Sequence, residues 1–192
     1  MKDYSNYSDL ELVTLLKEDG RAANDAFNVI YMKYSSQVYG YCLYRSSSSD
    51  EAKELMQETW ISFFNCVRGG KTIDRILPFV FTIARNQSIN RYRQKQSPIR
   101  LFSEETIDIE EFADISDFRT DMEKDEVFRM IKIGIHSLKD IYKDTLLLYW
   151  FGGFKIHEIA SICGENDVTV RKRFSRAMEQ LNKILKPYFI DN

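Results

Sequence analysis

The segment from Phe154 to Ala177 constrains the fold more than any other, because it holds two short helical patterns separated by one glycine. Before that glycine, four apolar residues recur at helical spacing: Ile156, Ile159, Ala160 and Cys163. Gly164 follows at once, where the end of a helix favours a residue that tolerates a positive φ. Asn166 or Asp167 can then cap a second helix, because either side chain can accept hydrogen bonds from the free N–H groups of its first turn. The segment therefore predicts two helices joined by a tight turn.

The second of these helices has one apolar face and one basic face. Its apolar residues recur at steps of four, three and four: Val170, Phe174, Ala177 and Leu181. The polar and basic residues lie opposite or on the flanks: Thr169, Arg171, Lys172, Arg173, Ser175 and Arg176. A bracing helix followed by such a helix is the layout of a helix-turn-helix, which reads the DNA major groove. For the segment alone, an ordinary pair of helices with a solvated basic face remains the alternative.

The composition is that of a helical protein without a global excess of positive charge. The 192 residues include only three prolines and eight glycines, and the net charge is −2. Any charge that binds nucleic acid must therefore be local. No apolar run resembles a signal peptide or a membrane span. We expect a cytoplasmic protein that does not insert into a membrane by itself.

No motif indicates catalysis, a cofactor or a metal site. Cys42, Cys66 and Cys163 are odd in number and far apart, which favours buried free thiols in a reducing compartment. His157 and Glu158 begin like a zinc-protease motif, but Ser161 stands where the second histidine is needed. There is no Gly-rich phosphate loop and no nucleophile elbow. The sequence argues against an enzyme.

The remaining patterns predict an all-α chain of two helical units. Capping boxes at Ser8 and Ser48 open two helices of the first unit, with a helix from about residue 24 to 45 between them, and Asp74 can cap a fourth. After Gln96 the composition changes, and residues 97–118 carry seven acidic residues against one arginine. We interpret residues 97–119 as a flexible acidic linker, either a solvated tether or a segment that lies along a basic surface. The predicted domains are therefore 1–96 and 120–192. The second contains the helix-turn-helix, whose last helix is expected to continue to about Lys186 and to be closed by Pro187.

Three segments, taken in this order, resemble a bacterial sigma factor of the extracytoplasmic-function (ECF) type. Residues 50–60 (DEAKELMQETW) are similar to the D-A-E-D-L-x-Q-E-x-F segment of that family. Residues 76–86 (ILPFVFTIARN) are similar to its F-x-x-W-L-x-x-I-A-R-N helix, and residues 154–177 match its helix-turn-helix without a gap. The chain departs from the family pattern at Asn90, Glu165, Asn166 and Val168. The promoter that it reads is therefore expected to be atypical.

The resemblance implies three sets of contacts. The first set would dock on core RNA polymerase: Glu54, Leu55, Gln57, Glu58 and Trp60. The second would recognise and help to melt the minus-10 element: Lys71, Arg75, Phe79, Arg85, Asn86, Asn90, Arg91 and Arg93. The third would read the minus-35 element as duplex: Asn166, Thr169, Arg171, Lys172, Arg173, Ser175 and Arg176. For Leu55, Trp60 and Phe79, packing in a core is the alternative, and it is the favoured interpretation of Leu55.

The resemblance also implies partners and a function. The partners are core RNA polymerase, promoter DNA and an anti-sigma factor that holds the protein inactive. The function is that of a promoter-specificity subunit that initiates transcription. A stand-alone helix-turn-helix regulator is a rival interpretation, but it leaves the first unit unexplained. A helical adaptor without a DNA role is another, but it leaves the basic helix face unexplained.

Overall fold

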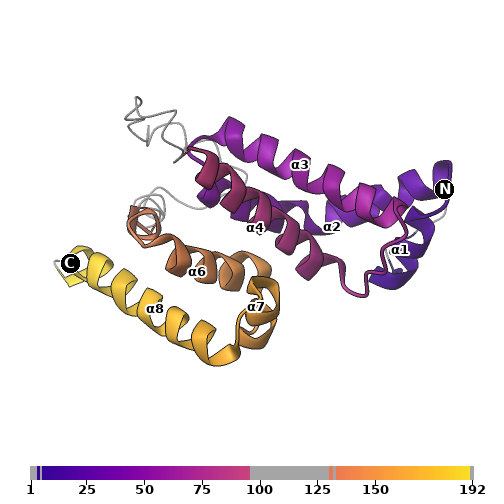
Figure 1. The fold of residues 1–192 in the computed structure, drawn as a ribbon. Coiled ribbons are helices and arrows are strands. Elements are labelled where there is room, and N and C mark those ends of the chain that lie inside the picture. Colours follow the sequence, from indigo (N-terminus) through magenta and orange to yellow (C-terminus); the bar gives the residue numbers. More distant parts are fainter. Residues whose placement is uncertain (1–3, 5, 96–129, 132, 191–192) are drawn as a thin grey trace.

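The computed structural model describes residue 4 and residues 6–95, 130–131 and 133–190, and every regular element in these ranges is an α-helix (Figure 1). The predicted all-α class is therefore confirmed. The predicted acidic linker, residues 97–119, lies outside the described residues, as do both of its boundaries.

The first group of helices comprises α1 (Asp9–Leu16), α2 (Arg21–Arg45), α3 (Ser49–Arg68) and α4 (Ile76–Lys95). The capping box of Ser8 and Glu11 is present at the start of α1, and the Ser48 hydroxyl accepts from the Glu51 N–H at the start of α3. The Glu51 carboxylate, however, accepts from the N–H of Ser47, so the second box is only half formed. α2 begins at residue 21, three residues before the predicted start, directly after Gly20 with φ of 88°.

The second group comprises a helical stretch at residues 133–136, followed by α6 (Asp140–Gly152), α7 (Ile156–Cys163) and α8 (Asp167–Ile190). Gly164 has the predicted left-handed conformation, with φ of 67°, and Asn166 caps α8 by accepting from the Thr169 N–H at 2.8 Å. The prediction that Pro187 ends the last helix is wrong, because α8 continues through it to residue 190. Pro187 is exposed, so water can satisfy the carbonyl that loses its partner there.

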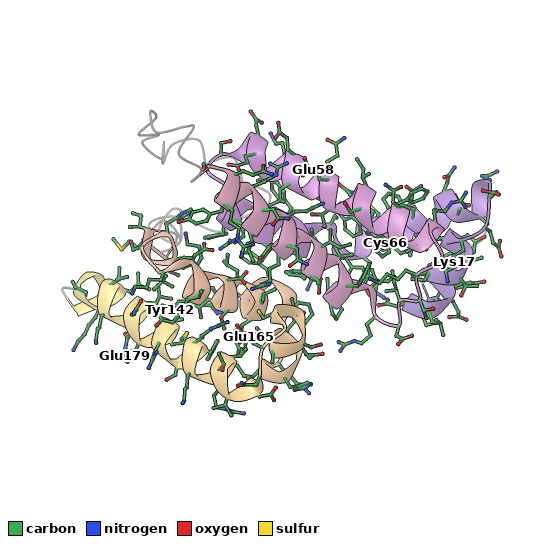
Figure 2. All side chains as sticks on the ribbon, viewed as in Figure 1. Lys17, Glu58, Cys66, Tyr142, Glu165 and Glu179 are labelled. Carbon is green, nitrogen blue, oxygen red and sulfur yellow. The ribbon has the colours of Figure 1, made fainter. Side chains whose placement is uncertain are left out.

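The two groups pack directly against each other. α6 lies against α2 and α4, and α7 lies against α4, whereas α8 covers the far side of α6 and α7 (Figure 1). Side chains fill the space between the groups, and one continuous cluster of buried residues runs through both (Figure 2). The sequence predicted two tethered units but not this contact.

The start of α4 is held by Asp9 of α1. One carboxylate oxygen accepts from the Ile76 N–H at 2.9 Å, and the other accepts from the Tyr34 hydroxyl at 2.6 Å and from Lys33 at 3.2 Å. Burial opposes ionisation, but these hydrogen bonds outweigh it and hold the pKa of Asp9 below its ordinary value of 3.8. The first N–H of α4 is thus bonded by a residue 67 positions away rather than by the predicted cap, Asp74.

Replacing Asp9 with asparagine should destabilise the protein by about 2 kcal/mol. The new amide has the shape of the carboxylate, but it cannot accept from all three donors and turns an N–H toward one of them. For a chain of this length, the expected fall in Tm is about 4–8 °C at pH 7. Thermal unfolding followed by circular dichroism measures it.

Asp74→Asn is the matched control, and it should change the Tm by less than about 1 °C, as expected for an exposed residue that caps nothing. Because the pKa of Asp9 is depressed on folding, its contribution is complete above the unfolded pKa and is lost as the pH falls through the folded value. The destabilisation caused by Asp9→Asn should therefore shrink below about pH 4. Equal Tm shifts for the two variants would refute this role of Asp9.

Candidate nucleic-acid interface

One stripe along α4 carries polar groups that are free to meet a ligand. Phe79, Asn86, Asn90 and Arg93 are spaced at steps of seven, four and three, so they fall on one side of the helix. Asn86, Asn90 and Arg93 are exposed. Phe79 is half-buried beside Phe63, with ring centroids 6.4 Å apart, and the Lys71 ammonium lies 4.7 Å from the centre of its ring. The stripe therefore offers two amides and a guanidinium beside a partly covered aromatic ring.

The other predicted minus-10 residues lie on the flanks of this stripe, and each is held by a carboxylate. On one flank, Arg91 pairs with Glu58 at 2.8 Å and with Glu54 at 3.5 Å, which ties α4 to α3. On the other flank, Arg85 pairs with Asp144 of α6, and Arg75 pairs with Glu158 of α7. The family resemblance implied DNA contacts for these three arginines, but in this conformation their charge is already engaged.

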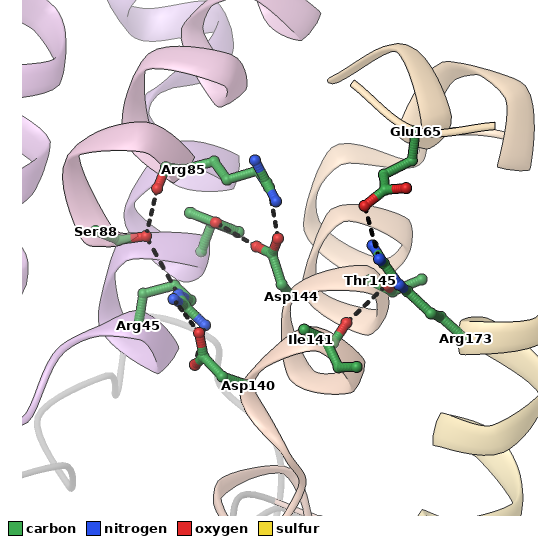
Figure 3. A network of polar contacts seen from close by, with 10 residues as sticks. Arg45, Arg85, Ser88, Asp140, Ile141, Asp144, Thr145, Glu165 and Arg173 are labelled. Carbon is green, nitrogen blue, oxygen red and sulfur yellow. Dashed lines mark hydrogen bonds and ion pairs between the residues drawn. The ribbon is translucent and has the colours of Figure 1, made fainter. Parts of the chain in front are cut away.

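Asp144 is the centre of a buried polar network between the two groups of helices (Figure 3). It accepts from the Tyr41 hydroxyl at 2.7 Å and from Arg85 Nε at 2.6 Å. Beside it, Arg45 donates to both oxygens of Asp140, at 2.6 and 3.0 Å, and to the Ser88 hydroxyl at 3.3 Å. Burial, reinforced by the Asp144 charge, raises the pKa of Tyr41 well above its ordinary value, so Tyr41 remains a hydrogen-bond donor.

The basic face of α8 points away from α2 and α4. Four of its predicted residues are exposed: Arg171, Lys172, Ser175 and Arg176. The predicted apolar face is confirmed, with Val170, Ala177 and Leu181 buried and Phe174 packed 4.8 Å from the ring of Tyr149.

Three predicted minus-35 residues have other partners or are partly covered. Asn166 is committed to capping α8, and Thr169 is half-buried. Arg173 is held by Glu165 at 2.7 Å, on the side of α8 that faces the rest of the protein (Figure 3). Glu165 is one of the positions where the chain departs from the family pattern. Its carboxylate neutralises Arg173 on the predicted recognition helix, so this departure changes the charge of the basic face.

The predicted polymerase-binding residues on α3 divide by burial. Glu54, Gln57 and Glu58 are exposed, whereas Leu55 and Trp60 expose only 1% and 4% of their surface. Leu55 therefore packs in the core, which is the interpretation that the sequence favoured for it. Trp60 is almost fully covered, but its ring lines a groove between α2 and α3.

The sequence patterns did not predict a groove that lies between α2 and α3. It has a volume of about 480 Å³ and is lined by Asn24, Phe27, Tyr31, Lys53, Met56, Gln57, Trp60, Ile61 and Phe64. Ile61 is half-exposed, and the rings of Tyr31 and Trp60 lie 5.4 Å apart. Phe27 and Tyr31 belong to the apolar stripe of α2, so their periodicity was visible, but periodicity cannot tell a covered face from an open one. An apolar floor beside exposed polar groups is typical of a protein-binding surface.

Two of the three free cysteines lie in surroundings that disfavour the thiolate. Burial raises the pKa of the Cys42 thiol to about 12 and that of Cys163 to about 11, so both stay protonated at neutral pH. No group of three or more metal-ligating side chains gathers among the described residues. In the same ranges, no helix combines the length and hydropathy needed to span a lipid bilayer.

Comparison with known proteins identifies relatives along nearly the whole chain. The sequence profile of sigma-70 region 2 matches residues 30–97, which hold much of α2 and all of α3 and α4. The RNA polymerase sigma-H factor of Pseudomonas aeruginosa is 24% identical over 179 residues, covering 90% of this chain and 93% of that protein. The ECF RNA polymerase sigma factor SigW of Bacillus subtilis is 25% identical over 178 residues, covering 89% of this chain and 95% of SigW.

A solved structure shares the fold of both groups of helices. It is the sigma factor RpoE in complex with the anti-sigma factor NepR from Bartonella quintana, with a TM-score of 0.66 and 22% identity over 86% of this chain and 98% of the matched chain. The resemblance inferred from the sequence motifs is thereby confirmed by the profile match, the relatives and the fold. The match to sigma-70 region 2 and the relatives along most of the chain support a bacterial sigma factor of the extracytoplasmic-function (ECF) type.

Proposed function

We propose that this sigma factor gives RNA polymerase its promoter choice by binding one promoter at two places. The stripe on α4 and the loop before it would meet the minus-10 element, and the basic face of α8 would read the minus-35 element. The observation that carries the proposal is the presence of these two separate, exposed polar faces in one chain of this family. Sigma factors are non-catalytic subunits, and as part of the transcription machinery the protein would act in the cytoplasm.

The two faces suit different forms of DNA. The α4 stripe has amides and a partly covered ring, which suit unpaired bases through hydrogen bonds and stacking. The α8 face has arginine and lysine, which suit phosphates and the acceptor edge of guanine in the major groove. This division supports melting at the minus-10 element and duplex recognition at the minus-35 element.

Core polymerase would dock on α3. Glu54, Gln57 and Glu58 provide a polar rim, and the groove between α2 and α3 provides an apolar floor. A partner helix could place its apolar side chains in such a groove. An anti-sigma factor is a further proposed partner, because the solved relative from Bartonella quintana is bound to one.

Reconstitution with core RNA polymerase tests the proposal as a whole. The expected result is a holoenzyme that starts transcription at specific genomic promoters, located by sequencing the transcripts that it makes in vitro. Core polymerase alone should not start at these sites. If no holoenzyme forms but the free protein binds duplex DNA specifically, the stand-alone regulator is correct. If the protein binds neither core polymerase nor duplex DNA, the interpretation as a helical adaptor is correct.

Replacing Arg171 and Lys172 together with alanine should weaken promoter binding of the holoenzyme by about 30-fold, or about 2 kcal/mol, through lost groove and phosphate contacts. Lys183→Ala, an exposed lysine farther along α8, is the control and should have little effect. Size-exclusion chromatography should show that the double variant and the Lys183→Ala variant both assemble with core polymerase as the wild type does. Lost assembly in the double variant would contradict the division of labour between α3 and α8.

Replacing Asn86 and Asn90 together with alanine should slow promoter melting by about tenfold, because bases leaving the duplex lose hydrogen-bonding partners on α4. Permanganate reactivity of thymines in the minus-10 region measures melting. Asn65→Ala, an exposed asparagine on α3, serves as the control. Binding to a promoter fragment that is already single-stranded at the minus-10 element should weaken in parallel. Normal melting by the double variant would remove α4 from the proposed mechanism.

A further inference from the structure

We propose that Val168 reads a thymine in the duplex that α8 binds, by covering the 5-methyl group of the base in the major groove. The identity of α8 as a duplex-reading helix rests on the proposed function. Val168 adds to that helix an apolar contact that depends on base sequence, on a face otherwise made of charged and hydroxyl groups. Three features support this role: its exposure, its place on α8 and the chemistry around it.

The first feature is that Val168 does not serve the packing of the fold. It is 61% exposed, and it is not one of the apolar residues packed against the buried cluster that runs through both groups of helices. A β-branched residue is also a poorer helix former than alanine. Neither the core nor α8 itself therefore needs a valine at this position, where the chain departs from the family pattern.

The second feature is the position of Val168 on α8. Asn166 caps the helix, and Val168 belongs to its first turn. Val170 is buried, so Val168 falls on the opposite, outward side, where Lys172 and Ser175 follow it at steps of four and three. In a helix-turn-helix, residues near the N-terminus of the second helix contact the base edges. Because Cα–Cβ bonds tilt toward the N-terminus of a helix, the methyl groups of Val168 lie at the leading end of this stripe.

The third feature is that the surroundings of Val168 suit a base and not a phosphate. Valine has no donor for phosphate oxygens, and the exposed carboxylate of Asp167 directly before it repels them. In the major groove only thymine presents a methyl group, beside its O4 acceptor. Against the polar edges of the other bases, valine would remove water without replacing its hydrogen bonds. The side chain therefore favours thymine.

The contact complements the basic residues of the same face. Arg171 and Lys172 are exposed, and side chains of their type attract the phosphates of DNA of any sequence, with an affinity that falls as salt is added. The covering of a methyl group is apolar, so salt does not screen it. Val168 therefore contributes discrimination between sequences, whereas its basic neighbours contribute much of the affinity.

Removal of single methyl groups from the DNA tests the proposal. Duplexes with a randomised segment are offered to the full-length protein assembled with core RNA polymerase, and the retained duplexes are sequenced. Each thymine in the upstream half of the selected sequence is then replaced in turn by deoxyuracil, which lacks only the methyl group. One replacement should weaken binding of the wild type by about fourfold, as expected for the loss of one buried methyl group. This ratio should be the same at low and at high salt, although both affinities fall as salt is added.

Three variants connect the methyl group to Val168. Val168→Ala should bind the thymine duplex about fourfold more weakly than the wild type does, with no further loss on the deoxyuracil duplex. Val168→Thr keeps one methyl group and should retain part of the sensitivity. Met178→Ala, the control, changes an exposed apolar residue farther along α8 and should behave as the wild type. The inference is overturned if the upstream half of the selected sequence lacks thymine, if no replacement weakens the wild type, or if Val168→Ala keeps the full sensitivity.

These outcomes are distinguishable from failure of the proposed function. If reconstituted polymerase starts at specific promoters but Val168→Ala keeps the sensitivity of the wild type, only the thymine contact is wrong. If no holoenzyme forms, the same selection is made with the free, full-length protein. A Val168-dependent methyl effect there would show that α8 reads thymine and that only the sigma role is wrong. A free protein that selects no sequence would overturn both.

Discussion

The packing of α6 against α2 and α4 is the contact on which the rest of this structure depends. It places one carboxylate, that of Asp144, where a buried tyrosine and an arginine both donate to it. In surroundings of low dielectric constant, a carboxylate left without such donors would be costly, so the register of α6 on its neighbours is fixed. α7 and α8 follow α6, since both pack on it. The position of α8, the predicted recognition helix, is thus set by a contact outside the helix-turn-helix.

The sequence predicted those features whose signals lie within a few residues of one another. The capping box at Ser8 and the left-handed turn at Gly164 are local, because a side chain and the backbone that it completes are neighbours in the chain. The hydrogen bond from Ile76 to Asp9 spans 67 residues, and that from Arg85 to Asp144 spans 59. No periodicity or spacing rule carries such information. The sequence therefore predicted the helices and the order of the two groups, but not how the groups pack.

The same distinction applies to the candidate interface. Spacing identified the basic helix face of Arg171 and Lys172, and the family resemblance pointed to Asn86 and Asn90; all four side chains are exposed as DNA binding requires. Spacing could not show which charges the protein itself neutralises. Arg85, Arg91 and Arg173 each pair with a carboxylate from another helix or from the turn before α8. These pairings depend on tertiary structure, and so does the groove beside α3.

The two candidate DNA faces are unequally available in this structure. The basic face of α8 is turned outward, whereas α6 and α7 cover one flank of the α4 stripe. Duplex contact by α8 therefore needs no rearrangement, whereas full contact by α4 has to displace Asp144 and Glu158 from their arginines. The proposed polymerase-binding surface on α3 lies on the side of α4 away from α6, so binding there does not compete with that contact directly.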